Sequence, residues 1–466
     1  MRIVLFGIGQ IYKEKKKFIS VADEIVGFLD NNQSLWGKTI EGIVVYPPEK
    51  VHEIFFDQII LMSNYAQEMK VQLIRLGCSR KKIMHYQEYL EAQKAGKLEV
   101  FFPVRKENFS KKRCLVITTD LEYNGGSIAA VYGALALKEK GYESVLAAPK
   151  CDPVFMKEIC GYGISLIIYR NLNHAKEQEL FWLDDFQYVV VNTLQMSCCG
   201  IEIAKRRKVV LWLHEPRPHY ESMTYWKDEI QEGVLQENLK VYGVSSVARD
   251  IFLMNYQLNQ IKILPYGIPD KYQGEKQREN RKFTFAMIGA VSQQKGQDIF
   301  WQAIQKMGDK RNSCTFLIIG KNLQDSCGKM IETASHQYIN LQLLGEVPHE
   351  EVMQLWQNID VLVVPSREDT LSIVATEALM LGKVCIVSEA VGISKYIHDC
   401  VDGFIIPTED ADQLADRMLW CMDHEDMLAE IGKKGRKIYE SSFSMEVFGN
   451  HLEDAIRGMS KIEKEA

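Results

Sequence analysis

Two carboxylates stand at either end of an apolar stretch, SREDTLSIVATEALMLG, at residues 366–382. Asp369 and Glu377 are eight positions apart, which places them before the start and in the second turn of one predicted helix. Apolar runs at residues 361–365 and 384–388 predict a strand on each side. We therefore expect a β-α-β unit that holds both acids near the carboxyl end of a strand, where α/β proteins bind ligands.

The start of this predicted helix has the features of an anion site. Thr370 or Ser372 can cap the helix, and Gly382 suits the left-handed residue that ends it. The free amides of residues 370–373 then point out of the helix, where its dipole favours an anion such as a diphosphate. We expect Thr370, Leu371 and Ser372 to contact that group.

Glu377 lies inside an otherwise apolar segment, so its carboxylate needs a hydrogen-bonding partner. The vicinal hydroxyls of a ribose fit this need, because an ionised carboxylate only accepts hydrogen bonds and a diol offers two donors. The alternative is an acidic first turn with a Glu that faces solvent. The spacing alone does not separate the two interpretations.

Length and composition limit the number of domains and the kinds of partner that the chain can have. With 466 residues the chain is long enough for two or three domains, and 46% hydrophobic residues suffice for sizeable cores. A net charge of −6 argues against nucleic acid as a partner. Four short basic clusters predict solvated faces, with contact to an anionic membrane as the alternative: residues 13–17, 80–82, 111–113 and 205–208.

The N-terminal segment MRIVLFGIGQ is not expected to be a signal peptide, because its apolar run is short and ends in glycines. No apolar run approaches the ~20 residues that a membrane-spanning helix needs. The eleven cysteines include no C-x-x-C pair, and Cys198 and Cys199 are adjacent, which suits neither a disulfide framework nor a zinc site. We expect reduced thiols in a cytoplasmic protein, with peripheral contact at the inner membrane face left open.

Short apolar runs alternate with longer helical patterns in three blocks, which predicts parallel sheets wrapped by helices. The first block has expected strands at residues 2–7, 24–30 and 58–62. The second has them at residues 114–120, 143–149, 164–169, 188–192, 209–215, 241–245 and 261–267. The third has them at residues 283–289, 315–320, 341–345, 361–366, 384–388 and 403–407. Polar segments at residues 102–113 and 270–282 predict the connections between blocks.

The stretch with the two acids resembles the Glu-x7-Glu motif of retaining GT-B glycosyltransferases, glycosyltransferase family 4 in particular. Asp369 stands in place of the first Glu, and Glu377 matches the second. The resemblance covers about residues 113–460. It implies that Glu377 binds the ribose of a sugar nucleotide and that Asp369 contacts the donor sugar or its developing charge.

A glycine-rich segment of the second block resembles another landmark of this family. DLEYNGGSIAAV, at residues 120–131, is similar to its first glycine-rich loop. This implies that Gly125 and Gly126 let the backbone approach the donor closely. A tight turn between strand and helix is the alternative.

LWLHEPRPHY, at residues 211–220, is similar to the strand end that carries a His near the reacting sugar. The resemblance implies that His214 binds hydroxyls of the donor sugar or positions the acceptor, so it joins the two acids as a catalytic candidate. Glu215 is a further candidate for acceptor or sugar contact. A purely structural His is the alternative.

MIGAVSQQKGQDIFWQAI, at residues 287–304, resembles the loop whose Arg and Lys clamp the donor diphosphate. Lys295 matches the Lys, whereas Ala290 stands in place of the Arg. We expect Arg367 or the helix amides to compensate for the missing charge. A surface lysine at a helix start is the alternative, which the helix dipole disfavours. No cluster of metal ligands is evident and the family does without one, so we expect neither a metal nor a cofactor.

Two further segments complete the resemblance. ILPYGIPD, at residues 263–270, matches the step into the second GT-B domain. LLGEVPHEEVMQLWQNIDVLVVPS, at residues 343–366, matches the region in which Gly345, Glu346 and Val347 flank the nucleotide base. That region packs on the base through its backbone, so it does not predict which base is bound.

The first block has a weaker signature. Gly7 and Gly9 begin a dinucleotide fingerprint, but Tyr12 stands where its third glycine would fall, and Asp30 ends the next strand at a spacing that suits a ribose. The block resembles the small Rossmann-like module at the front of some sugar acetyltransferases. We expect a structural or acceptor-recruiting module, with a second nucleotide site as the alternative.

These patterns and resemblances predict an α/β protein of GT-B architecture, with two facing Rossmann-like domains preceded by a small Rossmann-like domain. The expected parts are a small accessory domain at residues 1–100, an acceptor domain at 113–270 and a nucleotide-sugar donor domain at 271–445. A C-terminal helix at 446–466 is expected to pack back on the acceptor domain.

The resemblance implies a retaining hexosyltransferase that moves a sugar from a nucleotide donor, with a UDP-sugar preferred, to a hydroxyl of a glycan or lipid-linked glycan in cell-surface polysaccharide synthesis. One alternative is a non-catalytic GT-B subunit that binds a glycan and supports a partner enzyme, but Asp369, Glu377 and Lys295 are retained. Another is a nicotinamide-dependent oxidoreductase built on the first block, which the missing third glycine disfavours. Formation of an oligomer is left open.

Overall fold

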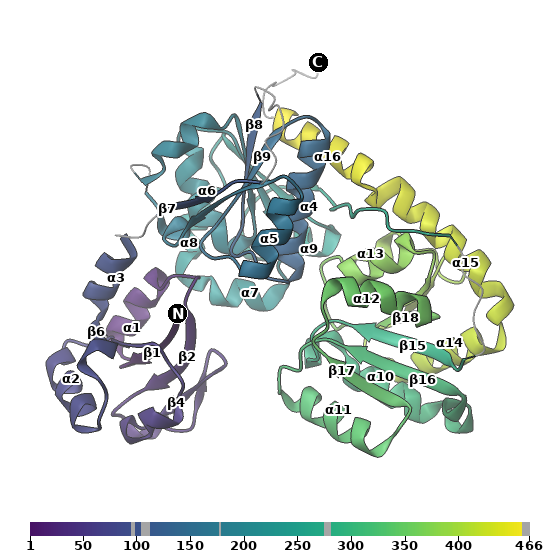
Figure 1. Ribbon diagram of the computed structural model, residues 1–466, viewed down its shortest axis with the longest axis horizontal. Coiled ribbons are helices and arrows are strands. Elements are labelled where there is room, and N and C mark those ends of the chain that lie inside the picture. The colour runs from purple at the N-terminus through teal and green to yellow at the C-terminus, as the bar shows by residue number, and fades with distance from the viewer. Residues whose placement is uncertain (95–97, 104–111, 177–178, 275–280, 459–466) are drawn as a thin grey trace. The chain divides into compact units, whose positions relative to one another are not determined.

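The computed structural model describes residues 1–94, 98–103, 112–176, 179–274 and 281–458. Three sheets organise these residues, with six, eight and six strands in chain order (Figure 1). Each of the three predicted blocks supplies one sheet, so the expected α/β architecture is confirmed.

The first sheet is parallel except at one edge, where β3 runs antiparallel to β4. Its strands in sheet order are β3 (Thr39–Ile40), β4 (Ile43–Tyr46), β2 (Glu24–Leu29), β1 (Arg2–Phe6), β5 (Gln58–Leu61) and β6 (Ile83–His85). Its helices are α1 (Gln10–Lys15), α2 (Ala66–Arg75) and α3 (Tyr86–Lys94). Alternate residues of β1 enter separate cores on the two faces, with Val4 and Phe6 in one and Ile3 and Leu5 in the other. The sequence analysis missed β3, β4 and β6, of which β3 and β6 have only two and three residues.

Asp30 holds the glycine loop that follows β1. Its Oδ2 accepts a hydrogen bond from the Ile8 amide at 2.9 Å, and its Oδ1 accepts one from the Asn32 amide at 2.8 Å. Gly7 adopts a φ of 95°, which a residue with a side chain rarely does. These contacts favour the structural interpretation of the first block over a second nucleotide site.

The second sheet has seven strands that match the prediction and one that does not. In sheet order they are β14 (Lys262–Ile263), β13 (Leu239–Gly243), β12 (Val209–Leu213), β11 (Tyr188–Asn192), β8 (Arg113–Ile117), β9 (Glu143–Ala148), β10 (Ser165–Tyr169) and β7 (Leu98–Phe101). Its helices are α4 (Gly125–Glu139), α5 (Pro153–Gly161), α6 (Ser197–Ala204), α7 (Arg217–Ser222), α8 (Lys227–Gly233) and α9 (Ser246–Asn255).

The unexpected strand, β7, corrects the predicted end of the first domain at residue 100. It pairs antiparallel with β10, with Phe101 opposite Leu166 and Leu98 opposite Tyr169. The first module therefore ends before β7, after α3. Residues 104–111, most of the predicted linker, lie outside the described residues, as do residues 275–280 of the second predicted connection.

A buried polar network joins the first module to the loop after β10. Asp23, whose side chain is fully buried, forms an ion pair with Arg170 and accepts a hydrogen bond from Tyr89 Oη at 2.8 Å. Arg170 Nε donates to Gln93 Oε1 at 2.9 Å, and Ser20 Oγ donates to the Arg170 carbonyl at 3.2 Å. Because a buried charge is costly unless paired, these contacts fix the module on its neighbour.

The third sheet is parallel throughout. In sheet order its strands are β17 (Leu341–Gly345), β16 (Cys314–Ile319), β15 (Phe283–Ile288), β18 (Val361–Val364), β19 (Val384–Ser388) and β20 (Phe404–Ile406). Its helices are α10 (Gln297–Lys306), α11 (Ser326–Gln337), α12 (His349–Leu355), α13 (Ile373–Met380), α14 (Ala411–Asp423) and α15 (Glu425–Ile438). Phe283, Phe285 and Met287 pack in one core with α10, α11 and α14, and Figure 1 shows α12 and α13 on the other side of the sheet.

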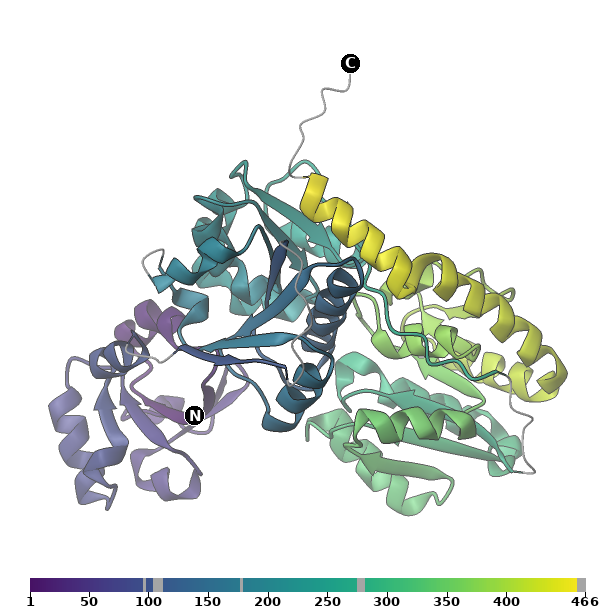
Figure 2. The same ribbon diagram turned by 45° about the horizontal axis from the view of Figure 1, so that its top comes forward.

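Helix α16 (Met445–Arg457) follows α14 and α15, and the three can be traced in succession in Figure 2. Phe448 stacks on Trp212 of β12 with ring centroids 5.4 Å apart, and Arg457 Nε donates to Tyr142 Oη at 2.9 Å. Helix α16 therefore contacts Trp212 of β12 and Tyr142, the residue that precedes β9. Residues 459–466 of the predicted C-terminal helix lie outside the described residues.

The chain divides into two compact units. One comprises Met1–Leu211, Pro218–Val241 and Ile456–Ala466, and the other comprises Trp212–Arg217 and Tyr242–Ala455. The loop after β12, with His214, thus belongs to the same unit as the third sheet, although the sequence analysis assigned it to the domain at residues 113–270.

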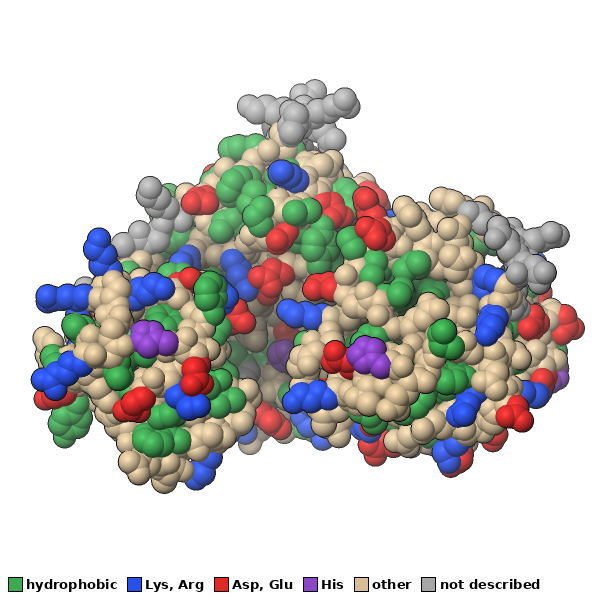
Figure 3. Space-filling model, turned by 60° about the horizontal axis from the view of Figure 1, so that its bottom comes forward, with side chains coloured by type: hydrophobic (Ala, Val, Ile, Leu, Met, Phe, Trp, Pro, Cys, Tyr) green, Lys and Arg blue, Asp and Glu red, His purple; other side chains and the backbone are tan. Residues whose placement is uncertain are grey.

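The surface and the cysteines have few special features. On the face drawn in Figure 3, Lys and Arg side chains are interspersed with Asp and Glu. All eleven cysteines are free thiols, as expected. In the part of the chain that the structure describes, no helix combines the length and the apolar composition that a membrane crossing requires.

Candidate active site

Helix α13 begins where the sequence predicted an anion site. Ser372 is the N-cap, and its Oγ accepts a hydrogen bond from the Ala375 amide at 3.4 Å. Ser372 has a φ of 77°, an uncommon conformation for a residue with a side chain, and such strain clusters at functional sites. Gly382, with a φ of 66°, ends the helix in the predicted left-handed conformation.

The segment before this helix is fixed to its neighbours. Thr370 is buried, its Oγ1 donates to the His214 carbonyl at 2.7 Å, and its own carbonyl accepts a hydrogen bond from Ser245 Oγ. Gly392 comes so close that a Cβ atom on it would lie 1.8 Å from the Thr370 carbonyl oxygen. Leu371 is buried as well. The loop is therefore held in one conformation before any ligand binds.

Asp369 and Lys295 meet directly. Lys295 Nζ lies 2.7 Å from Asp369 Oδ2, and the two side chains are 33% and 12% exposed, so the pair can still be reached from solvent. Lys295 ends a short 3₁₀ turn, and Gly296 follows with a φ of 79°. A Cβ atom at Gly296 would lie 2.3 Å from the Pro365 carbonyl oxygen, so glycine lets the lysine loop reach the end of β18.

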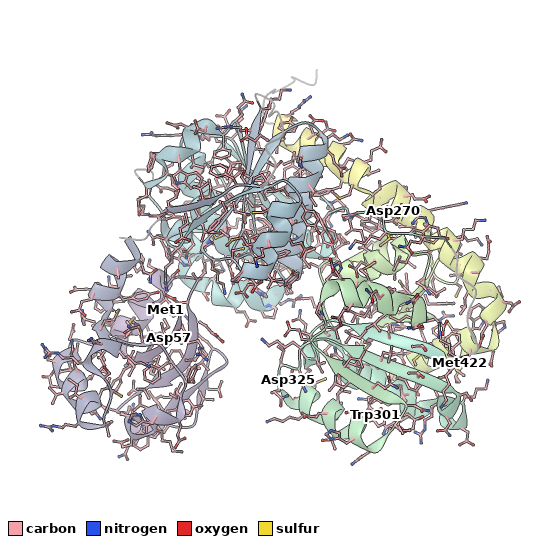
Figure 4. All side chains as sticks on the ribbon, in the orientation of Figure 1. Met1, Asp57, Asp270, Trp301, Asp325 and Met422 are labelled. Carbon is pink, nitrogen blue, oxygen red and sulfur yellow. The ribbon has the colours of Figure 1, made fainter. Side chains whose placement is uncertain are left out.

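The loop around Ala290, which stands where the resemblance leads one to expect Arg, is held by hydrogen bonds within the loop. Gln297 is buried, its Nε2 donates to the Ala290 carbonyl at 3.0 Å, and its Oε1 accepts from the Ser292 amide at 3.2 Å. The next residue along, Gln293, donates its amide to Asp325 Oδ2 at 2.9 Å (Asp325 is labelled in Figure 4). These contacts fix the loop that carries Lys295 without supplying a second cation.

Arg367 was expected to supply that missing charge, but its guanidinium is already paired. It forms two hydrogen bonds with Asp298, at 2.7 and 2.9 Å, and one with Glu409 at 2.6 Å. The hydrogen bonds with Asp298, followed by those with Glu409, raise the pKa of Arg367 above its ordinary value. This network argues against the predicted contact of Arg367 with a diphosphate, because two carboxylates already neutralise it.

Glu377 does not face solvent, so that alternative is wrong. It is 5% exposed, and its Oε1 lies 2.7 Å from Nε2 of His349. His349 is the first residue of α12, in the segment where the sequence analysis considered only Gly345, Glu346 and Val347. The buried carboxylate therefore has the partner that its burial requires, and that partner is a protein side chain.

His214 lies after β12 against aromatic rings. Its ring makes an angle of 69° with that of Trp212, with centroids 4.3 Å apart, and it stacks on Tyr266 with centroids 6.4 Å apart. Burial lowers the pKa of His214 to about 3, so its imidazole is neutral near pH 7. Its Nε2 is buried and meets no partner within the described residues. A neutral imidazole can exchange hydrogen bonds with a ligand but carries no charge.

The residues after His214 are tied to the loop with the acids. Glu215 is buried, and its Oε2 accepts from the His214 amide at 3.0 Å. The Arg217 amide donates to Glu368 Oε1 at 2.6 Å. With the bond from Thr370 to the His214 carbonyl, these contacts place the predicted His and the predicted acids around one loop.

Gly125 and Gly126 belong to the other compact unit. They open α4, whose N-cap is Asn124, and the Gly126 carbonyl accepts from Asn192 Nδ2 at 3.0 Å. A Cβ atom on Gly126 would make only ordinary contacts, the closest at 3.5 Å to Asn124 Oδ1. The surrounding protein therefore does not require glycine here, which leaves close approach of a ligand as a reason for it.

The structure thus joins Lys295 with Asp369 and links Thr370 to His214. The sequence analysis missed His349, Asp298 and Ser245, whose partners lie 28 to 125 positions away in the chain. No group of three or more His, Cys, Asp or Glu side chains suited to a metal ion occurs among the described residues. The groups that can take part in chemistry are Lys295, the acids Asp369 and Glu377, the neutral imidazole of His214 and the start of α13.

Two family models match separate parts of the chain. Residues 270–438 match the family described as glycosyl transferases group 1, and residues 1–84 match a family described as C2185-like, N-terminal. The predicted likeness of the first module to sugar acetyltransferases is not tested by these matches. The matched segment 270–438 contains Lys295, Asp369 and Glu377.

Two curated relatives illustrate the sequence similarity. The N,N'-diacetylbacillosaminyl-diphospho-undecaprenol alpha-1,3-N-acetylgalactosaminyltransferase of Campylobacter jejuni is 26% identical over 157 residues, 33% of this chain and 39% of the relative. The capsular polysaccharide biosynthesis glycosyltransferase CapM of Staphylococcus aureus is 24% identical over 209 residues, 42% of this chain and 54% of the relative. The matches thus span between about two-fifths and half of these relatives.

Solved structures show the fold over a longer stretch. The Anabaena protein HepE, solved in complex with UDP-glucose, aligns with a TM-score of 0.64 at 15% identity, covering 74% of this chain and 99% of HepE. A glycosyltransferase from Rickettsia africae aligns with a TM-score of 0.62 at 16% identity, covering 76% of this chain and all of that chain. The chain has the GT-B fold. Residues 270–438, which contain most of the third-sheet domain, are similar to the group 1 glycosyl transferases, and the small α/β module precedes the two GT-B domains along the chain.

Proposed function

We propose that the protein is a retaining glycosyltransferase that takes a sugar from a nucleotide donor, with a UDP-sugar preferred, and transfers it to a hydroxyl of a glycan or lipid-linked glycan. The observation that carries the proposal is the Lys295–Asp369 pair beside the start of α13, with Glu377 on the same helix. One relative is named for capsular polysaccharide biosynthesis and another for transfer to a diphospho-undecaprenol-linked sugar, and these names, with the UDP-glucose complex of HepE, support the substrate classes.

In the proposed complex, Lys295 and the amides at the start of α13 bind the diphosphate, Glu377 binds the ribose, and Asp369 lies by the sugar. Nε2 of His214 has no partner among the described residues but is enclosed, so it exchanges a hydrogen bond with a sugar hydroxyl only after neighbouring side chains move aside. The bond between the anomeric carbon and the phosphate oxygen breaks, and the acceptor oxygen attacks from the same face. The acceptor proton passes to the departing phosphate, so no protein base is needed.

The test is a binding screen of UDP-, GDP- and dTDP-sugars, together with NAD, by thermal shift and calorimetry. We expect one sugar nucleotide to bind. Glu377→Ala should lower the affinity for it about 10- to 100-fold, the cost of losing a hydrogen bond to a charged group. Unchanged affinity in a folded Glu377→Ala variant would refute the ribose assignment.

A non-catalytic glycan-binding subunit is the second candidate. Ala290 favours it, because it removes one cation of the family's diphosphate clamp, and Arg367 is already paired with Asp298. Slow hydrolysis of the bound donor in the absence of acceptor distinguishes the two. A protein that binds glycan but neither binds nor hydrolyses a sugar nucleotide is the subunit.

A further inference from the structure

The carboxylate of Glu377 is held on one side only. Its Oε1 lies 2.7 Å from His349 Nε2, whereas no donor meets Oε2 among the described residues. Oε2 has no partner among these residues and is not fully enclosed, so a ligand can reach it. Glu377 therefore presents one occupied oxygen and one open oxygen.

His349 sets this asymmetry. A carboxylate only accepts hydrogen bonds, so Nε2 of His349 carries the proton in the contact, whatever the state of Nδ1. His349 begins α12 and Glu377 lies within α13, so the bond joins two helices on the same side of the third sheet. A long acidic side chain that would otherwise sample several rotamers is thereby fixed before the ligand arrives.

We propose that His349 is a positioning residue for ribose recognition. By holding Oε1, it directs Oε2 at the vicinal diol of a ribonucleoside diphosphate sugar, and the site thereby selects ribose over 2′-deoxyribose. This inference rests on the proposed binding of ribose by Glu377. A site built to receive two hydroxyl donors rejects an analogue that lacks one, because a buried acceptor is then left unpaired.

The experiment measures the affinity of the full chain for UDP, GDP and their 2′-deoxy analogues by calorimetry. The variants are His349→Phe, which removes the donor and keeps an aromatic ring, and His349→Gln, which keeps a donor. We expect His349→Phe to weaken the ribonucleotide about 3- to 10-fold, the cost of one side chain that is no longer fixed in advance. The preference for ribose should shrink by the same factor, and His349→Gln should restore most of it.

A second pair in the same compact unit provides a matched control. His398 Nδ1 lies 2.8 Å from Asp402 Oδ2, and this carboxylate is also buried. His398→Phe breaks a comparable bond elsewhere, so it should leave the ratio of ribose to deoxyribose affinity unchanged. A general loss of packing would lower both nucleotide affinities together, whereas loss of positioning lowers the ratio.

Glu377→Gln distinguishes the inference from the function on which it rests. If His349 acts through Glu377, His349→Phe adds no further loss in the Glu377→Gln background. Suppose that Glu377→Gln lowers the affinity for the ribonucleotide but His349→Phe leaves the ratio of ribose to deoxyribose affinity unchanged. The positioning role is then wrong and the proposed function stands. The same conclusion follows if His349→Phe still lowers the affinity when Glu377 is already replaced by Gln. If no ribonucleotide binds, or Glu377→Gln changes nothing, both are wrong. His349→Leu replaces His349→Phe if circular dichroism shows that the latter does not fold.

Discussion

The ammonium of Lys295 lies 2.7 Å from the carboxylate of Asp369, although 74 positions separate the two residues in the chain. Each neutralises the other while no ligand is present. In the proposed complex, a diphosphate replaces Asp369 as a partner of Lys295. Asp369 is then free to interact with the positive charge that develops on the sugar.

This exchange predicts how a Lys295→Met variant behaves. Loss of the ammonium should lower the affinity for UDP about 10- to 100-fold, as expected for a hydrogen bond to a charged group. The affinity for uridine should not change, because uridine has no phosphate. Calorimetric titration with both ligands is the measurement. Lys306→Met, on the adjoining helix α10 where Lys306 pairs with Asp412, is the control and should change neither affinity. Equal loss of both ligands in Lys295→Met would show that the lysine has only a structural role.

Transfer should proceed without a divalent cation. Lys295 and the amides at the start of α13 offset the diphosphate charge in the proposed complex. Donor hydrolysis and transfer should therefore be unchanged in excess chelator. Complete loss of activity that is restored by manganese or magnesium would mean that a metal ion, and not Lys295, is the main partner of the diphosphate.

His214 predicts a pH dependence of stability. Its folded pKa is about 3 because of burial, below the ordinary value of 6.5. Between these values the unfolded chain binds a proton that the folded chain excludes, so the free energy of unfolding rises with pH, by up to about 1.4 kcal/mol per unit for one group. Urea denaturation from pH 4.5 to 7.5 should show a smaller rise for His214→Phe than for the unmodified protein.

Two other histidines must be considered when the pH profiles of these proteins are compared. His174 has a pKa lowered to about 4 by burial, so it contributes to the same rise and remains in the His214→Phe variant. His336 on α11 is exposed, and His336→Phe should reproduce the unmodified profile. An identical slope in all three proteins would show that the pKa of His214 is the same in the folded and unfolded states.

Deletion of residues 1–94 should leave donor binding intact, because Lys295, Asp369 and Glu377 belong to the other compact unit. The truncation keeps β7, which a cut at residue 105 would remove from the sheet. Stability should fall, since Arg170 loses Asp23 and Gln93, and transfer to the natural acceptor should fall if the module recruits it. A truncated chain that is folded by circular dichroism but does not bind donor would show that the module completes the site.

Most of the fold could be predicted because long buried strands of parallel sheets leave apolar runs that stand out in the sequence. β7 could not, since its side chains are largely exposed and its assignment depends on pairing with β10. The two acids were singled out by their spacing together with a family resemblance, and Lys295 by the resemblance of its loop. His349 was not, because a single His in a polar segment gives no sign that a helix 28 residues later will bring Glu377 to it.

The pairing of Arg457 with Tyr142 bridges 315 positions of the chain, and this separation has a consequence for synthesis. A ribosome makes the chain from its N-terminus, so the domain that contains Tyr142 emerges long before its last helical contact exists. All strands of the third sheet are translated in the interval. Nascent chains released before residue 457 should therefore carry a middle domain that lacks its final contact and is more exposed to proteases. Completion of that domain therefore requires that every strand of the third sheet has already been translated.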